Sequence, residues 1–343
     1  MNWIIDQLLK FTGSQNFLSM QLDITNTCNL HCTHCYQPTN NDGLDLPLEK
    51  WCDILNQYDA LSAKLHLRHH FTLSGGEPTI SSLFIPFLEL LRSRFPDAGI
   101  NILTNGTMIS DEMVRAIKLS GADVQVSIDG PNSELHDSIR GRGNFQKAVC
   151  GIMKLRANGV HVVLQAVLSR QTVPFIPSFF DMAERLDVAM MNFTRFIPQG
   201  RGKILQQTRN GQMLGPLELR DAYASILESA ARSKVRTATN LPLFVLLEQG
   251  LGAHGKAGFQ GLVIDHLGNL KVTSRADFIL GNIFAEGLEN LFLRHPIMNQ
   301  LRAGHIRGCG SCRFYDRCGG DRNASYVVHG SFLEIDPGCW LEM

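Results

Sequence analysis

The nine cysteines of this sequence are its residues best suited to chemistry, and they are unevenly placed. Three lie near the start, four lie near the end, and Cys52 and Cys150 stand alone in apolar, helix-like surroundings. We expect no signal peptide, and clustered cysteines in a reducing cytosol are typical of metal ligands rather than disulfides. Cys52 and Cys150 are expected to be small buried hydrophobes.

The first cluster, in "CNLHCTHCY", has Cys28, Cys32 and Cys35 at the spacing C-x3-C-x2-C. Three thiolates in one short loop can hold a metal centre and leave a coordination position open for a substrate or cofactor. An all-sulfur ligand set favours an iron–sulfur cluster or zinc. His31 and His34 lie inside the loop as rival ligands, and we expect them to be ordinary loop residues.

The second cluster is complete, because Cys339 follows at a distance from Cys309, Cys312 and Cys318. Its spacing is C-x2-C-x5-C-x20-C, and four thiolates close a tetrahedral or cubane site. Zinc and [4Fe–4S] both fit this pattern, and a second iron–sulfur site in the same chain favours iron.

The rest of the composition is that of an ordinary globular protein. The 343 residues are 44% hydrophobic and 19% charged, with a formal net charge of zero. A neutral chain gives no reason to expect nucleic acid or an anionic membrane as partner. The absence of a long apolar run predicts no membrane-spanning helix, and the expected location is the cytoplasm.

Alternating strand-like and helix-like segments must position the first cluster. Helical patterns separate most of six predicted strands: residues 19–25, 66–76, 99–106, 123–130, 161–169 and 189–198. This alternation predicts a parallel sheet, open or curled into part of a barrel. Ligands of such sheets bind at the carboxyl ends of the strands, which is where the first cysteines and the polar motifs fall.

The pattern changes after Gly202. Residues 206–216 are expected to be a linker, 217–233 and 240–252 helices, 261–274 a β-hairpin turning at Gly268-Asn269, and 286–304 helical. The expected organisation is α/β: an N-terminal segment (1–17), a partial (β/α)6 barrel (18–202), a linker with helices (203–258) and a small C-terminal domain (259–343).

The cysteine loop followed by aromatic Tyr36 resembles the radical S-adenosylmethionine (radical SAM) superfamily. The resemblance implies that Cys28, Cys32 and Cys35 hold a [4Fe–4S] cluster whose fourth iron binds SAM. It further implies reductive cleavage of SAM to a 5′-deoxyadenosyl radical, which abstracts hydrogen from an unactivated carbon. An electron donor of the flavodoxin or ferredoxin type is then an expected partner.

Later motifs follow in the order that this family has them: "SGGEP" (74–78), "TNG" (104–106) and "SIDG" (127–130). By resemblance, the first binds the SAM amine, Ser127 and Asp129 lie near the ribose, and Arg140 pairs with the SAM carboxylate. The residues expected to bind the cofactor are Tyr36, Gly75, Gly76, Glu77, Asn105, Ser127, Asp129, Arg140 and Arg195.

The tail resembles the SPASM and twitch domains that follow the barrel in many radical SAM enzymes. A full SPASM domain binds two auxiliary clusters, whereas here Thr273 and Arg322 stand where two ligands of the inner cluster would be. The resemblance therefore implies one auxiliary [4Fe–4S] cluster on Cys309, Cys312, Cys318 and Cys339, and two [4Fe–4S] clusters in total.

Proteins with such tails mostly modify peptides, so the expected function is maturation of a ribosomally made precursor peptide by a crosslink, ring or other modification. The 27 residues before Cys28 are too few for a peptide-recognition domain. We therefore expect the precursor peptide to be recognised by the barrel mouth, an edge strand or a separate peptide-recognition protein. Radical SAM enzymes that trim tetrapyrrole side chains in haem d1 and haem biosynthesis have similar tails and are the alternative. A non-catalytic iron–sulfur electron carrier is a third hypothesis.

Overall fold

The computed structural model describes residues 17–341 apart from 38–42, 209–210, 254–256 and 260. Residues 1–16 of the predicted N-terminal segment (1–17) lie outside the described residues. The six predicted strands are confirmed as β1 (Phe17–Asp23), β2 (Arg68–Ser74), β3 (Gly99–Thr104), β4 (Asp123–Ser127), β5 (Val162–Leu168) and β6 (Met190–Arg195). Each pairs in parallel with the next along the chain.

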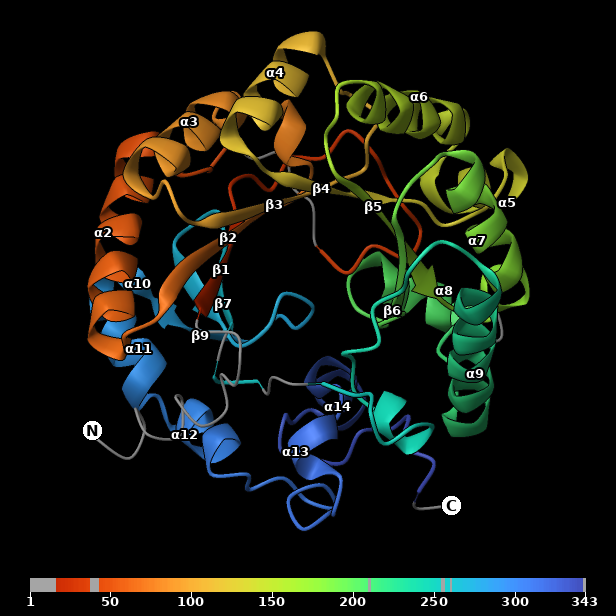
Figure 1. The fold of residues 1–343 in the computed structure, drawn as a ribbon. Helices are drawn as coiled ribbons and strands as arrows, with labels where there is room; N and C mark the ends of the chain where they lie inside the picture. Colours follow the sequence, from red (N-terminus) through yellow and green to blue (C-terminus); the bar gives the residue numbers. More distant parts are fainter. Residues whose placement is uncertain (1–16, 38–42, 209–210, 254–256, 260, 342–343) are drawn as a thin grey trace.

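The helices between these strands cover the outer face of the curved sheet (Figure 1). They are α2 (Leu48–Leu65), α3 (Phe84–Arg94), α4 (Asp111–Ser120), α5 (Ser133–Arg140), α6 (Asn144–Ala157) and α7 (Ile176–Arg185). Gly121 caps the end of α4 in the left-handed conformation, with φ of 63°. Alternate strand residues are buried, as in Leu18, Met20 and Leu22 of β1, so the core lies between sheet and helices.

The sheet is a partial barrel that does not close. Its order is β6-β5-β4-β3-β2-β1-β7-β8-β9, which leaves β6 and β9 as the two edges. The predicted hairpin is confirmed as β7 (Gly261–Ile264) and β8 (Asn269–Lys271), and β7 pairs in parallel with β1. The sequence did not predict β9 (Ile279–Asn282), which extends the hairpin. The start of the predicted C-terminal domain thus continues the sheet of the barrel.

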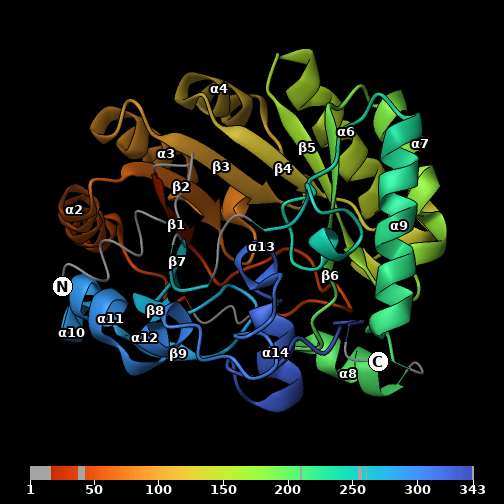
Figure 2. The same ribbon diagram turned by 60° about the horizontal axis from the view of Figure 1, so that its bottom comes forward.

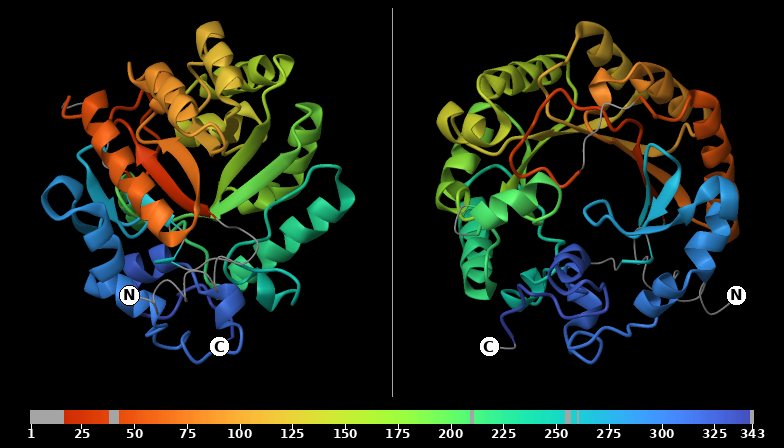
Figure 3. Two further views of the ribbon diagram at one scale, coloured as in Figure 1. Left: turned by 60° about the vertical axis from the view of Figure 1, so that its left-hand side comes forward. Right: turned by 180° about the vertical axis from the view of Figure 1, so that it is seen from behind.

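The cysteine-rich tail lies between the two edges of the sheet (Figures 1 and 3). It contains α13 (Tyr315–Cys318) and α14 (Arg322–His329). In the turned view of Figure 2, both lie between β6 on one side and the strands β7, β8 and β9 on the other. The helices before it are α10 (Ile283–Glu286), α11 (Leu288–Arg294) and α12 (Pro296–Arg302). The last two form the predicted helical segment, interrupted where His295 precedes Pro296 in an extended conformation.

Residues 201–252 depart from the expected pattern. Helix α8 (Arg201–Thr208) occupies the start of the predicted linker, and α9 (Pro216–Arg232), which was predicted, packs against α7. The helix predicted over 240–252 is wrong, because only the short 3-10 turn η3 (Phe244–Leu246) forms. Leu243 has φ of 74°, which a right-handed helix cannot contain.

The two isolated cysteines are not both buried as expected. Cys52 is half-buried in α2, whereas Cys150 is exposed on α6. The apolar neighbours of Cys150 do face the core, since Ile152 and Ala148 are fully buried. The prediction for Cys150 was wrong because residues two apart on a helix point in different directions.

Candidate active site

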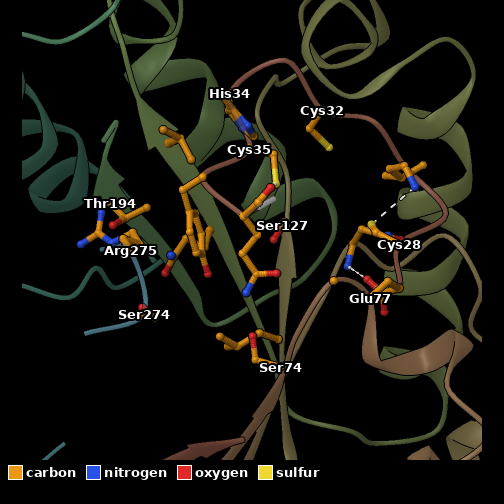
Figure 4. A pocket seen from close by; sticks show the side chains of 18 of the residues that line it. Cys28, Cys32, His34, Cys35, Ser74, Glu77, Ser127, Thr194, Ser274 and Arg275 are labelled. Carbon is orange, nitrogen blue, oxygen red and sulfur yellow. Dashed lines mark hydrogen bonds between the residues drawn. The ribbon is translucent and has the colours of Figure 1, made fainter. Parts of the chain in front are cut away.

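A cavity of about 1180 Å³, partly open to solvent, lies at the carboxyl ends of the parallel strands. The three cysteines of the first cluster line it, with Cys28 and Cys32 on one side and Thr194 and Arg275 on the opposite side (Figure 4). The structure brings most of the predicted cofactor-binding residues to this cavity: Tyr36, Gly75, Gly76, Glu77, Asn105, Ser127, Arg140 and Arg195. Asp129 is the exception.

The two glycines of "SGGEP" let two backbone segments approach each other. A Cβ on Gly75 would lie 2.3 Å from the Thr25 carbonyl oxygen, and one on Gly76 would lie 2.2 Å from that of Thr27. The Gly76 and Glu77 amides donate to these same two carbonyls, at 2.8 and 2.9 Å. The glycines therefore fix the start of the cysteine loop against the end of β2.

Glu77 is a buried carboxyl that joins the ends of β2 and β3. Its Oε1 accepts from the hydroxyls of Thr79 and Thr104, both at 2.6 Å, and its Oε2 accepts from the Asn105 amide at 2.7 Å. Burial raises the pKa of Glu77, and these hydrogen bonds oppose the rise. Asn105 in turn donates to Asn29 of the cysteine loop at 2.8 Å.

Asp129 lies behind the cavity wall with no exposed surface. Its Oδ2 pairs with Arg140 Nε at 2.5 Å and with His34 Nε2 at 2.6 Å, and its Oδ1 accepts from the Val167 amide at 2.8 Å. Burial alone would raise the pKa of Asp129, but the charges of Arg140 and His34 hold it far below its usual range. Both carboxylate oxygens are thus bound within the protein, and the expectation that Asp129 lies near a ribose stays a prediction.

Arg140 and His34 connect Asp129 to the cysteines. Arg140 Nη1 lies 3.9 Å from Cys32 Sγ, and His34 belongs to the same loop as Cys32 and Cys35. His136 supports Asp129 from the other side, because its Nδ1 accepts from the Asp129 amide at 3.2 Å. One buried network therefore fixes the loop that carries the thiols.

Arg195 at the end of β6 connects the cavity to the cysteine-rich tail. Its guanidinium is buried, and Nη1 donates to Asp336 Oδ2 at 2.8 Å. Asp336 also accepts from the amides of Asp321 and Gly338, at 2.7 and 2.8 Å. This ion pair stabilises the tail against the barrel.

The four cysteines of the tail line one further cavity, of about 420 Å³. Burial raises the pKa of the Cys318 thiol to about 11, and burial likewise raises the pKa of Cys339. Burial therefore disfavours the free thiolate, but such a thiol still loses its proton readily when it binds a metal. The Leu243 amide donates to Cys318 Sγ at 3.3 Å. The residue that makes this hydrogen bond has the left-handed backbone conformation described above.

Both cysteine sets fit iron–sulfur clusters. Among the described residues, no three His, Cys, Asp or Glu side chains converge closely enough to hold a single metal ion. The thiolates of a cubane bind different iron atoms and so need not converge on one point. The first set lines a large open cavity, which leaves room for SAM beside the cluster, whereas the second set lines a smaller one.

The sequence did not predict the contacts of several residues at these sites. His34, expected to be an ordinary loop residue, pairs with Asp129, and Arg201 Nε donates to the Cys32 carbonyl at 3.0 Å. Arg275 Nη1 donates to the Arg195 carbonyl at 2.8 Å. The position of Arg201 at the end of a predicted strand was a usable signal, whereas Arg275 had none.

Comparisons with known proteins agree with this geometry. Residues 22–172 match the profile of the radical SAM superfamily. Mycofactocin maturase MftC of Mycolicibacterium smegmatis is 28% identical over 334 residues, covering 92% of this chain and 81% of the relative. AdoMet-dependent heme synthase of Methanosarcina barkeri is 24% identical over 357 residues, covering 97% and 98%.

The fold also resembles a solved structure over almost its whole length. The crystal structure of Streptococcus suis SuiB bound to precursor peptide SuiA matches with a TM-score of 0.75 and 16% identity, covering 99% of this chain and 80% of SuiB. The described part of the chain contains no helix long and apolar enough to cross a membrane.

Proposed function

The radical SAM domain at residues 22–172 makes this chain a radical SAM enzyme, and from that premise we propose that it modifies a carbon of a ribosomally made precursor peptide. Two likenesses support the proposal. The mycofactocin maturase matches across most of both chains. The SuiB structure that matches this fold holds a precursor peptide.

Our choice of a peptide as the substrate rests on one observation, which is that the arginines lining the cavity already have partners within the protein. Arg140 and Arg195 are paired with Asp129 and Asp336. Arg201 and Arg275 donate to backbone carbonyls. A tetrapyrrole presents several carboxylates and needs several available cations, whereas a peptide segment is bound largely by hydrogen bonds and apolar contacts.

Modification of a tetrapyrrole side chain is the second candidate. It is favoured by the likeness to the heme synthase of M. barkeri, which extends over nearly the full length of both chains. The engaged arginines count against it, so we keep it as the alternative that the experiment below must exclude.

In the proposed reaction, Cys28, Cys32 and Cys35 would hold the [4Fe–4S] cluster, which would supply the electron for the cleavage of SAM. The Asp129 network keeps Arg140 and the cysteine loop in place, and Glu77 fixes the ends of β2 and β3 beside the cavity that would hold the cofactor. The partial barrel and the tail shield the reacting atoms from water. Ser127, Asn105 and Tyr36 line the cavity, and we propose that they contact SAM.

We further propose a second [4Fe–4S] cluster on Cys309, Cys312, Cys318 and Cys339, in a C-terminal auxiliary domain that follows the barrel. With four thiolate ligands it has no open position, which favours electron transfer or structural support over substrate binding. The other proposed partners are a flavodoxin or ferredoxin electron donor and a separate peptide-recognition protein, in the reducing cytosol.

The proposal is tested with anaerobically reconstituted protein, SAM and dithionite. We expect 5′-deoxyadenosine to form and a short peptide encoded beside the gene to lose hydrogen mass. An iron tetrapyrrole given in parallel should remain unchanged. Modification of the tetrapyrrole alone would favour the second candidate, and no 5′-deoxyadenosine with either substrate would contradict the enzyme itself.

A further inference from the structure

Arg322 is a buried arginine beside the second cysteine set. It begins α14, four positions after Cys318, and is only 4% exposed. It lines a cavity that lies between the barrel and the tail. A guanidinium buried this far loses its hydration and must be compensated by protein groups.

The partners of Arg322 are carbonyls and a sulfur, and none of them is an acid. Nη1 donates to the carbonyls of Phe332 and Glu334, at 2.9 and 2.6 Å. Nη2 points to Cys309 Sγ at 3.7 Å. The planar fork of the guanidinium therefore holds one N–H group toward a thiol that we assign to the second cluster.

Gly320 is required for this placement. A Cβ on Gly320 would lie 2.1 Å from Arg322 Nη2, and the glycine has φ of 64°. The second glycine of "CGGDR" thus provides space for the guanidinium beside the cysteines.

The one acid among the residues that line the four-cysteine cavity is already compensated. Asp336 lines that cavity, but its Oδ2 pairs with Arg195 at 2.8 Å and its Oδ1 accepts from the Gly338 amide. Arg322 therefore adds a positive charge next to Cys309 that Asp336 does not cancel.

We propose that Arg322 sets the reduction potential of the second cluster through Cys309. This inference rests on the second cluster of the proposed function. Reduction adds negative charge to a thiolate-bound cluster, and a cation that donates an N–H group to a ligand sulfur stabilises that charge. Arg322 is a positioning and tuning residue that makes the second cluster easier to reduce.

The test is an EPR-monitored redox titration of the full-length chain in which Cys28, Cys32 and Cys35 are all changed to Ala. This background leaves only the second cluster. Arg322→Gln should retain about four irons, as one cubane requires. Its reduction should become about tenfold less favourable, which is ~59 mV to the negative side for one electron.

Two further variants separate tuning from folding. Arg322→Lys keeps the charge without the fork and should shift the potential by less than Arg322→Gln. Arg313→Gln removes an exposed arginine next to Cys312, whose guanidinium lies over the Phe314 ring, and should leave the potential unchanged.

The outcomes are distinguishable. A background protein with no iron would overturn the second cluster itself and this inference with it. Iron retained with an unchanged potential in Arg322→Gln would overturn the role of Arg322 alone. If Arg322→Gln loses its iron, Arg322→Lys decides: a negative shift supports the inference, and an unchanged potential contradicts it.

Discussion

Arg140 Nε lies 2.5 Å from Asp129 Oδ2, so the arginine that approaches the Cys32 thiol is held from behind by a wholly buried carboxylate. The pair connects "SIDG" to the end of α5: Asp129 follows β4, which ends at Ser127, and Arg140 is the last residue of α5. The carboxylate of this pair lies outside the cavity, yet the pair orients groups that face the cavity.

Asp129→Asn should destabilise the protein and weaken SAM binding. Breaking a buried ion pair by removing one partner costs about 3–5 kcal/mol, because the other charge stays buried. Urea denaturation measures the loss of unfolding free energy, and equilibrium titration measures SAM affinity.

Asp123→Asn is the matched control, since Asp123 begins the same strand and pairs with His161 at the exposed end. It should change stability by less than about 1 kcal/mol. Equal losses in the two variants would show that the buried network has no special role.

Cys32→Ala and Cys312→Ala should each remove one cluster and leave the other. The two sets line separate cavities, so loss of one thiolate should not reach the second set. Iron and sulfide analysis should fall from about eight of each to about four in both variants.

Of the variants Cys32→Ala and Cys312→Ala, only Cys32→Ala should lose SAM binding. Retained SAM binding in Cys312→Ala is the result that supports two independent sites. Its loss would mean that the tail and the barrel depend on each other for cluster assembly.

The fold of the barrel was predictable because its signals are local. The strands alternate with amphipathic helices, and Ser74, Thr104 and Ser127 end strands at one edge, as parallel packing requires. The prediction of a helix over 240–252 was wrong because its apolar pattern gives no sign that Leu243 adopts a left-handed backbone conformation. Strand β9 was missed because it is only four residues long and half of it is Gly281 and Asn282.

The contacts of the site were less predictable than its members. The cysteine patterns are short and complete in the sequence, whereas Arg195 pairs with Asp336 across 141 positions. The sequence gives no local sign that Asp129 lies outside the cavity, because Ser127, two positions earlier, is expected on the same face and does line the cavity. The role of the glycines in "SGGEP" also required the structure, since the neighbouring backbone comes from Thr25 and Thr27.

Gly76→Ala should destabilise the cysteine loop. The added Cβ would lie 2.2 Å from the Thr27 carbonyl oxygen, and backbone cannot yield as a flexible side chain would. Overpacking of this kind costs about 1–3 kcal/mol. Thermal denaturation with and without reconstituted iron measures the effect.

Gly250→Ala is the control, because its Cβ would meet nothing within 4 Å. Its melting temperature should equal that of the parent protein. A parent-like melting temperature for Gly76→Ala as well would mean that the loop can move away from β2 without cost.

His136 makes the stability of the fold depend on pH. Burial, followed by the charge of Arg140, lowers its pKa from 6.5 to about 4. The unfolded chain therefore binds more protons than the folded one between these values, and stability rises with pH. The contribution of neutral His136 is complete above about pH 6.5 and is lost as the pH falls toward 4, by about 3 kcal/mol at most.

Urea denaturation at pH 4.5, 5.5 and 7 should show this slope in the parent protein, and His136→Gln should reduce it. Glutamine can still accept from the Asp129 amide but does not titrate. His161→Gln, at an exposed histidine that pairs with Asp123, should leave the slope unchanged. The same slope in His136→Gln as in the parent would assign the pH dependence to other groups.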